Sequence, residues 1–146
     1  MRIHPPTSHG LTRATPPEGS VILGDYIPGG TTVAISAYVM HRNEQLFPNP
    51  EFYNPDRWLG DAGKELGPYF LAFSAGARGC IGRNISYLEQ TVALASVIHR
   101  YDIELVNPGF VPEMIEMNNL HPSELPIRLC RRQVSGEKDL DVAGGV

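Results

Sequence analysis

The sequence predicts an α+β fold in which short β-strands and a proline-rich coil precede one long helix and further short strands follow it. Three observations support this prediction. The thirteen prolines and fifteen glycines among 146 residues indicate extensive irregular structure. The segments between turns alternate and are rich in β-branched residues, which favours strands. Only residues 82–99 repeat apolar side chains three and four positions apart, as an amphipathic helix requires.

The overall composition excludes several classes of protein. A chain of 146 residues suits one domain that can bury a core. The net charge of −4 gives no sign of a nucleic-acid-binding surface. Two cysteines are too few for a disulfide framework and fit a reducing compartment. The sequence shows no apolar run of membrane-spanning length and no signal peptide at its start, so we expect no membrane segment in this chain.

The N-terminal part of the chain predicts short strands separated by glycine and proline turns. Residues 1–7 show neither an N-cap nor a first helical turn, so we expect them to be the end of a longer element. Residues 7–13 are expected to be extended. Residues 21–28 alternate around a Gly-Asp turn and predict a hairpin. After a Pro-Gly-Gly turn, residues 31–38 predict another strand.

The middle of the chain predicts a short helix or turn over residues 39–46, followed by a well-packed coil over residues 47–60. Prolines in the coil forbid a regular helix or an inner strand, whereas its aromatic side chains require burial. The pair His41-Arg42 could ligate a metal, but we expect a structural hydrogen-bonding role for it. Residues 61–67 are polar and predict an exposed face.

The helix predicted at residues 82–99 carries apolar residues on two faces, which is typical of a helix buried within a larger fold. We expect the rest of this chain to be too small to cover it. Residues 101–105 and 125–130 alternate and predict strands, and residues 114–122 predict an irregular hairpin. Cys130 lies among arginines and is expected to be an incidental free thiol.

The residues with the most chemical content lie in one loop, Phe73–Gly82. Three glycines, one arginine and one cysteine fall within seven residues of it, directly before the predicted helix. Glycines let the backbone adopt positive φ and approach closely, so the loop can wrap around the thiol of Cys80. The N–H groups of a helix N-terminus and the cation of Arg78 favour the thiolate form of such a cysteine. A thiolate in this setting can be a nucleophile, a redox centre or a metal ligand.

The order of residues in this loop matches a known signature. Phe73, Gly76, Arg78, Cys80 and Gly82 match the haem-binding pattern F-x-x-G-x-R-x-C-x-G at all five fixed positions. The chain therefore resembles the cytochrome P-450 family of haem-thiolate monooxygenases. The resemblance implies that Cys80 is the axial ligand of the haem iron, that Arg78 pairs with a haem propionate and that Phe73 packs beside the sulfur. The alternative is a buried structural cysteine in a glycine-rich turn.

Further matches extend the resemblance along the chain. Arg13 stands where family members place a propionate-binding basic residue, and a solvated surface charge is an equal alternative for it. Residues 8–11, and a turn near residues 114–119, match substrate-contacting segments of the family. Arg2 matches the arginine of the family's E-x-x-R pair, whose glutamate would precede this sequence. Arg57, in the proline-rich coil, would complete their ion network because a guanidinium can brace several acceptors.

On this resemblance, residues 1–133 are predicted to be a partial P-450 domain, the C-terminal haem-ligating portion of that fold, and residues 134–146 a disordered tail. The resemblance implies haem b as cofactor, an organic substrate and O₂ as reactants, and an NAD(P)H-dependent reductase as electron donor. A full-length relative is expected in the endoplasmic reticulum membrane, facing the cytoplasm. The residues that activate O₂ in the family lie upstream, so we expect this chain to be part of a longer enzyme and inactive alone.

Two other functions compete with this interpretation. The first is a haem-binding sensor or carrier without oxygenase activity, which would require the chain to hold haem by itself. The second is a structural zinc module that uses Cys80, Cys130 and histidines. Zinc sites need closely spaced ligands such as C-x-x-C, and the two cysteines are 50 residues apart, which argues against this second alternative.

Overall fold

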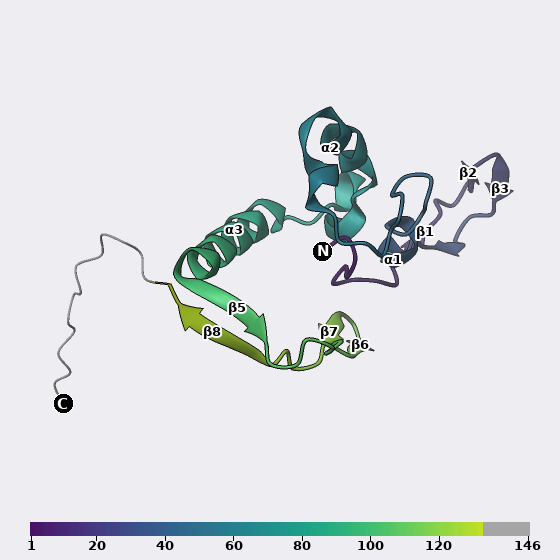
Figure 1. The fold of residues 1–146 in the computed structure, drawn as a ribbon. Helices are drawn as coiled ribbons and strands as arrows, with labels where there is room; N and C mark the ends of the chain where they lie inside the picture. The colour runs from purple at the N-terminus through teal and green to yellow at the C-terminus, as the bar shows by residue number, and fades with distance from the viewer. Residues whose placement is uncertain (133–146) are drawn as a thin grey trace. The chain divides into compact units, whose positions relative to one another are not determined.

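The computed structural model describes residues 1–132 and shows the predicted mixture of short strands and helices (Figure 1). The disordered tail predicted at residues 134–146 lies outside the described residues. The chain divides into two compact units, and each is described by itself. Among the described residues, the first comprises residues 1–81 and 113–123, and the second comprises residues 82–112 and 124–132. A single partial domain over residues 1–133 stays a prediction.

The strands of the first unit form antiparallel pairs. β1 (Arg13–Ala14) pairs with β4 (Thr32–Val33), β2 (Ser20–Ile22) with β3 (Asp25–Ile27), and β6 (Met114–Glu116) with β7 (Leu120–Pro122). The β2–β3 hairpin turns at Leu23 and Gly24, one residue earlier than the sequence predicts. Both residues have positive φ, which the favoured two-residue hairpin turn requires. Glycine adopts this conformation freely, whereas Leu23 adopts it at a cost in strain.

The segment after β4 departs from the prediction. Instead of a strand over residues 31–38, β4 covers two residues and helix α1 (Ala37–Met40) begins two residues before the helix or turn predicted at 39–46. Ser36 explains the early start, because its hydroxyl oxygen accepts a hydrogen bond from the backbone N–H of Val39 at 3.2 Å and caps the helix. Turns follow α1, in agreement with the second half of the prediction.

The proline-rich coil packs through some of its aromatic side chains only. Phe47 is fully buried, and its ring centroid lies 6.2 Å from that of Trp58, the last residue of a 3₁₀ turn. Phe52 and Tyr53 are instead 67% and 76% exposed. The burial predicted for the coil's aromatic residues is therefore correct for Phe47 and wrong for these two, because the described residues do not enclose them.

A run of short helices leads from the coil to the glycine-rich loop. These are the 3₁₀ turn η1 (Pro55–Trp58), the helix α2 (Gly60–Leu66), and the 3₁₀ turns η2 (Gly67–Tyr69), η3 (Leu71–Phe73) and η4 (Gly76–Arg78). The polar segment at 61–67 is largely exposed, as predicted, and most of it is helical. The tight turns on both sides of Ser74 and Ala75 give the loop its curvature.

The second unit consists of helix α3 (Arg83–Arg100) and the antiparallel strands β5 (Tyr101–Leu105) and β8 (Ile127–Arg131). The helix agrees with the predicted bounds to within a residue at each end. His99 and Arg100 lie in its last turn, where positive charge is favourable for the helix dipole. The two strands pair over their full length; β5 has the predicted bounds, whereas β8 begins two residues later and ends one residue later than the strand predicted at 125–130.

The apolar side chains of α3 are exposed. Ile85, Leu88, Val92 and Ile98 have exposed fractions between 54% and 65%. The sequence predicts a helix that needs a larger fold to bury it, and the described residues indeed leave it uncovered. Within residues 1–132, no helix is both long enough and apolar enough to cross a membrane.

Candidate functional site

The glycine-rich loop closes on itself through its backbone. The N–H of Cys80 donates a hydrogen bond to the carbonyl oxygen of Phe73 at 2.8 Å, and the N–H of Gly79 donates to the carbonyl oxygen of Gly76 at 3.0 Å. Gly76 has a φ of 66°, a conformation that favours glycine, and a side chain added there would meet no protein atom within 4 Å. The loop therefore holds the cysteine in a defined position and leaves open space beside Gly76.

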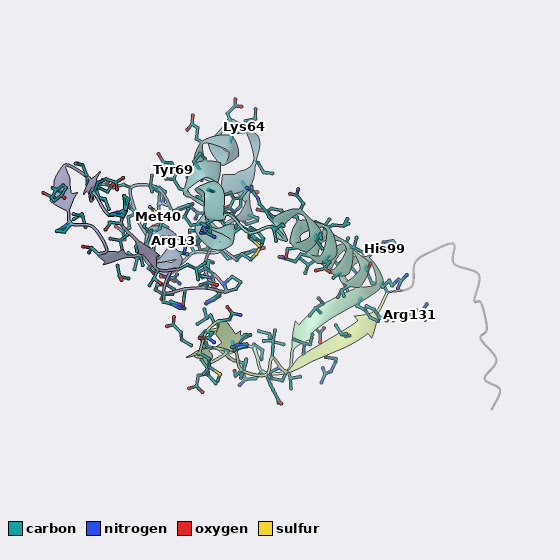
Figure 2. The ribbon with its side chains drawn as sticks, turned by 180° about the vertical axis from the view of Figure 1, so that it is seen from behind. Arg13, Met40, Lys64, Tyr69, His99 and Arg131 are labelled. Atoms are coloured by element: carbon teal, nitrogen blue, oxygen red, sulfur yellow. The ribbon has the colours of Figure 1, made fainter. Side chains whose placement is uncertain are left out.

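An apolar cavity of about 870 Å³ lies against this loop in the first unit. The residues of β2, β3, β4 and their surroundings that line it are mostly aliphatic, and the loop contributes Phe73, Arg78 and Cys80. Arg13 of β1, labelled in Figure 2, completes the lining with a second guanidinium group. The cavity thus combines apolar walls with one thiol, two guanidinium groups and the carboxyl side chain of Asp25.

The structure brings most of the predicted site residues together. Arg13, Phe73, Arg78 and Cys80 line the same cavity, and Gly76 lies in the loop that borders it. Gly82 belongs to the second unit, where it is the N-cap of α3 without a side-chain cap. The individual roles of these six residues toward haem stay predictions.

Cys80 is a free, exposed thiol, so it differs from the buried structural cysteine of the alternative interpretation. Residues 1–132 contain no group of three or more His, Cys, Asp or Glu side chains that could hold a metal ion. A zinc site needs at least three such protein ligands. In the described residues, Cys80 is therefore not part of a zinc site with three protein ligands.

The two arginines of the predicted ion network meet at the proline-rich coil. Arg2 is buried, and its guanidinium donates hydrogen bonds to the carbonyl oxygens of His41 at 2.9 Å and Pro50 at 2.5 Å. Arg57 donates to the carbonyl oxygens of Asn54 at 3.2 Å and of Pro48 at 3.3 Å. Both side chains brace backbone carbonyls, and their joint pairing with a glutamate stays a prediction.

Positive charge accumulates around Arg2. Burial lowers the pKa of Arg2, and the neighbouring cations Arg57 and Arg42 lower it further, against the opposing effect of Glu51. Glu51 is engaged by Arg42, whose Nε and Nη2 donate to the two carboxylate oxygens at 2.6 and 3.2 Å. The guanidinium of Arg42 also lies 3.5 Å from the centroid of the Tyr38 ring.

His41 has the structural role that the sequence predicts. It is fully buried, and its Nδ1 lies 3.0 Å from the carbonyl oxygen of Arg2, while Nε2 accepts a hydrogen bond from the N–H of Leu71 at 2.8 Å. These partners require the neutral tautomer with the proton on Nδ1. Burial lowers the pKa of His41 to about 4, since the charged form would lose its water.

The two segments predicted to contact substrate, near residues 8–11 and 114–119, lie against each other within the first unit. The hydroxyl of Ser8 donates a hydrogen bond to the carboxylate of Glu116 in β6, and Nδ1 of His9 lies 3.2 Å from the same carboxylate oxygen. The N–H of Leu120 donates to the carbonyl oxygen of Pro6 at 2.7 Å. The hydrogen bond from Ser8 is the main cause that lowers the pKa of Glu116. Sequence reasoning does not reveal this contact, because Ser8 and Glu116 are 108 residues apart.

Comparisons with known proteins identify the family of this chain. The family model of cytochrome P-450 matches residues 1–131. The chain is 40% identical over 107 residues to cytochrome P-450 monooxygenase penB of Penicillium thymicola, covering 73% of this chain and 24% of that protein. It is 42% identical over 134 residues to cytochrome P-450 monooxygenase cicH of Emericella nidulans, covering 90% of this chain and 27% of that protein. The chain therefore spans about a quarter of the length of these relatives.

Solved structures support the same assignment. A crystal structure of a cytochrome P-450, CYP102L1, matches with a TM-score of 0.77 and 28% identity over 90% of this chain and 29% of that chain. The haem domain of cytochrome P-450DA matches with a TM-score of 0.79 over the same share of this chain, and at 21% identity it shows the fold alone. The predicted fold class, a portion of the P-450 fold, is confirmed. With a family model that covers nearly all described residues, the chain belongs to the cytochrome P-450 family.

Proposed function

We propose that this chain supplies the haem-ligating part of a haem-thiolate monooxygenase, with Cys80 as the axial ligand of the iron. The observation that carries the proposal is the cavity of the first unit, where one thiol and two guanidinium groups, together with one carboxyl side chain, that of Asp25, surround an apolar space. Residues 1–132 contain no group of three or more potential metal-ligating side chains, and we propose that the macrocycle of haem supplies the other ligands of the iron.

The residues around the cavity fit haem b in size and in chemistry. A volume of about 870 Å³ lies within the range of roughly 300–1,000 Å³ that is usual for sites of this kind. The aliphatic lining suits the flat apolar body of the group. Arg13 and Arg78 can each form a charge-assisted pair with a propionate carboxylate. The open space beside Gly76 allows a planar ligand to approach the loop backbone.

The residues of this chain would bind and orient the cofactor. When bound, haem supplies the binding and activation of O₂, and a thiolate ligand favours that chemistry by donating electron density. Cys80 would hold the iron through its sulfur, and the hydrogen bond from its N–H to the carbonyl oxygen of Phe73 fixes the loop that presents it. Arg13 and Arg78 would orient the cofactor by pairing with its propionates, and the apolar walls would exclude water from its body.

For the longer protein we propose the reaction of a monooxygenase, which inserts one oxygen atom of O₂ into an organic substrate. This extension is supported by the relatives, which are named monooxygenases. The proposed electron source is NAD(P)H through a reductase, and the proposed location is the endoplasmic reticulum membrane. We propose that this chain alone does not turn over substrate, because it spans about a quarter of the length of those relatives.

An absorption spectrum of the haem-loaded chain tests the proposal. The purified chain is mixed with haemin, reduced and exposed to CO, and its Soret band is recorded for the wild type and two variants. Cys80→Ala removes the proposed ligand. Cys130→Ser is the matched control, because Cys130 is the other free, exposed thiol and lies in the second unit.

The expected result is a strongly red-shifted Soret band in the wild type and in Cys130→Ser that is lost in Cys80→Ala. That pattern would identify the thiolate of Cys80 as the ligand. The same spectrum in the wild type and Cys80→Ala would overturn the assignment of Cys80. Loss of the band in Cys130→Ser alone would move the ligand to Cys130.

A further inference from the structure

His41 connects two remote parts of the first unit through both of its ring nitrogens. Its Nδ1–H donates to the carbonyl oxygen of Arg2, 39 residues away, and its Nε2 accepts from the N–H of Leu71, 30 residues away. The side chain is fully buried, with 0% of its surface exposed. A buried ring with both nitrogens satisfied cannot turn without leaving a buried polar group unpaired, so its orientation is fixed.

From His41, contacts run without interruption to the backbone of the proposed haem ligand. Leu71 is the first residue of the 3₁₀ turn that ends at Phe73. The ring of His41 stacks on that of Phe70 with centroids 5.3 Å apart and an interplanar angle of 10°, and Phe70 meets Phe73 edge-on at 6.3 Å. The carbonyl oxygen of Phe73 then accepts the hydrogen bond of the Cys80 N–H at 2.8 Å.

We propose that His41 is a positioning residue for the thiolate loop, which it holds through the N–H of Leu71 and the ring of Phe70. The role toward haem rests on the proposed function, whereas the role toward the loop does not. His41 touches neither the cavity nor the cysteine, so it acts through Leu71, Phe70 and Phe73.

The charges around His41 suit this role. The groups that act electrostatically on it are the guanidinium groups of Arg2 and Arg42 and the amino group of Met1, each of them a basic group. Burial is the main effect that disfavours a proton on Nε2, and these groups add to it, so this nitrogen stays an acceptor for the N–H of Leu71 at neutral pH. A neutral acceptor in a ring of fixed orientation therefore holds the backbone of Leu71, the residue from which the chain runs toward the cysteine loop, in one position.

Two substitutions separate the two hydrogen bonds of His41. Asparagine in His41→Asn can still donate to the carbonyl oxygen of Arg2 but is too short to reach Leu71. Glutamine in His41→Gln can place its amide oxygen where Nε2 accepts the bond from Leu71. If the hydrogen bond to Leu71 positions the loop, His41→Asn should lose the fixed loop position, whereas His41→Gln should keep it.

Hydrogen exchange of single amides, followed by NMR in the haem-free chain, tests the role toward the loop. In His41→Asn we expect the amides of Leu71 and Cys80 to exchange about tenfold faster than in the wild type, the effect of losing one buried hydrogen bond. In His41→Gln both rates should return to within about twofold of the wild type. Phe47→Leu is the matched control, because Phe47 is equally buried and contacts the His41 ring edge-on at 6.0 Å.

Three results would overturn the proposal. The first is an unchanged exchange rate of the Cys80 amide in His41→Asn, since His41 would then have no effect on the position of the cysteine. The second is an equal effect on Cys80 in Phe47→Leu at a matched loss of stability, since His41 would then act as ordinary core. The third is unprotected Leu71 and Cys80 amides in the wild-type chain, since both bonds are required.

The Soret band of the reduced, CO-exposed chain tests the role toward haem. We expect His41→Asn to lose a large part of the red-shifted band to the form without thiolate ligation, and His41→Gln to keep it. A full red-shifted band in His41→Asn would overturn this part. Failure of the proposed function is distinguishable, because then the wild type itself shows no such band, whereas the exchange result for the loop still holds.

Discussion

The core around His41 and the face of α3 differ in how far the chain covers its own apolar side chains. In the first unit, His41 and Phe47 are fully buried, and their rings lie in contact with each other and with neighbouring aromatic rings. In α3, Ile85 and Leu88 are more than 60% exposed. Within the described residues, the core around His41 is thus enclosed, whereas the apolar face of α3, the longest described helix, is exposed.

This difference indicates that the core around His41 contributes more to the stability of the chain than the face of α3 does. Buried apolar area, together with buried hydrogen bonds that are satisfied, supplies most of the free energy of folding. Helix α3 buries little apolar area in the described structure, and its hydrogen bonds are mainly those of its own backbone. Substitutions in the His41 core should therefore be costly, and equivalent substitutions on α3 should be nearly silent in this chain.

The largest expected effect is that of Phe47→Ala. Phe47 has 0% exposed surface, and its removal leaves a cavity between His41 and Trp58. Such a truncation typically costs about 3–5 kcal/mol, which is a large part of the stability of a small protein. Urea denaturation followed by tryptophan fluorescence, with Trp58 as the reporter, measures the loss. A cost below about 1 kcal/mol would show that this core is not packed in solution.

Acidification should weaken the same core through His41. Burial lowers the pKa of His41 to about 4 in the folded chain, below its ordinary value of 6.5, so between these values the unfolded chain binds the extra proton. The contribution of neutral His41 to the free energy of unfolding is therefore complete above pH 6.5. It is lost as the pH falls toward 4, by roughly 3 kcal/mol at most. Denaturation midpoints between pH 4 and 7 measure this dependence. His41→Gln, which does not titrate, should remove this component, and an unchanged slope in that variant would assign it to another group.

A smaller effect is expected where Ser8 contacts the β6–β7 hairpin. Ser8 is buried and its hydroxyl donates to the carboxylate of Glu116, so Ser8→Ala should cost about 1 kcal/mol. The amide of Leu120, bonded to the carbonyl oxygen of Pro6, should exchange faster in this variant. Glu116→Gln keeps an acceptor for Ser8 and serves as the control. Equal exchange rates at Leu120 in Ser8→Ala and the wild type would show that the backbone bond alone holds the hairpin.

Local patterns predict much of this molecule. Helix α3 follows from apolar spacing within 18 residues, and the cysteine loop from five fixed positions within ten. The β2–β3 hairpin is predicted with its turn displaced by one residue, because the sequence places Gly24 in the turn but does not reveal that Leu23 also adopts positive φ. In each case the decisive interactions lie within one element or one turn.

Contacts between residues that are far apart in the chain could not be predicted from the sequence. The bond between His41 and Leu71 spans 30 residues, and that between Ser8 and Glu116 spans 108. Nothing in the local pattern selects these partners. The exposure of Tyr53 was not predicted for another reason. An aromatic side chain favours burial, but the sequence does not indicate which residues would cover it.

The smallest expected effect, that of Leu88→Ala in α3, tests the other side of the comparison. Leu88 is 65% exposed, so the truncation removes little buried area, and alanine has a slightly better helix propensity than leucine. The free energy of unfolding of this chain should change by less than about 0.5 kcal/mol, against several for Phe47→Ala. A cost above about 2 kcal/mol, measured by the same denaturation, would show that the face of α3 is covered in solution. If that cost disappeared on dilution, the cover would be a second copy of the chain, whereas a cost independent of concentration would place it within the same molecule.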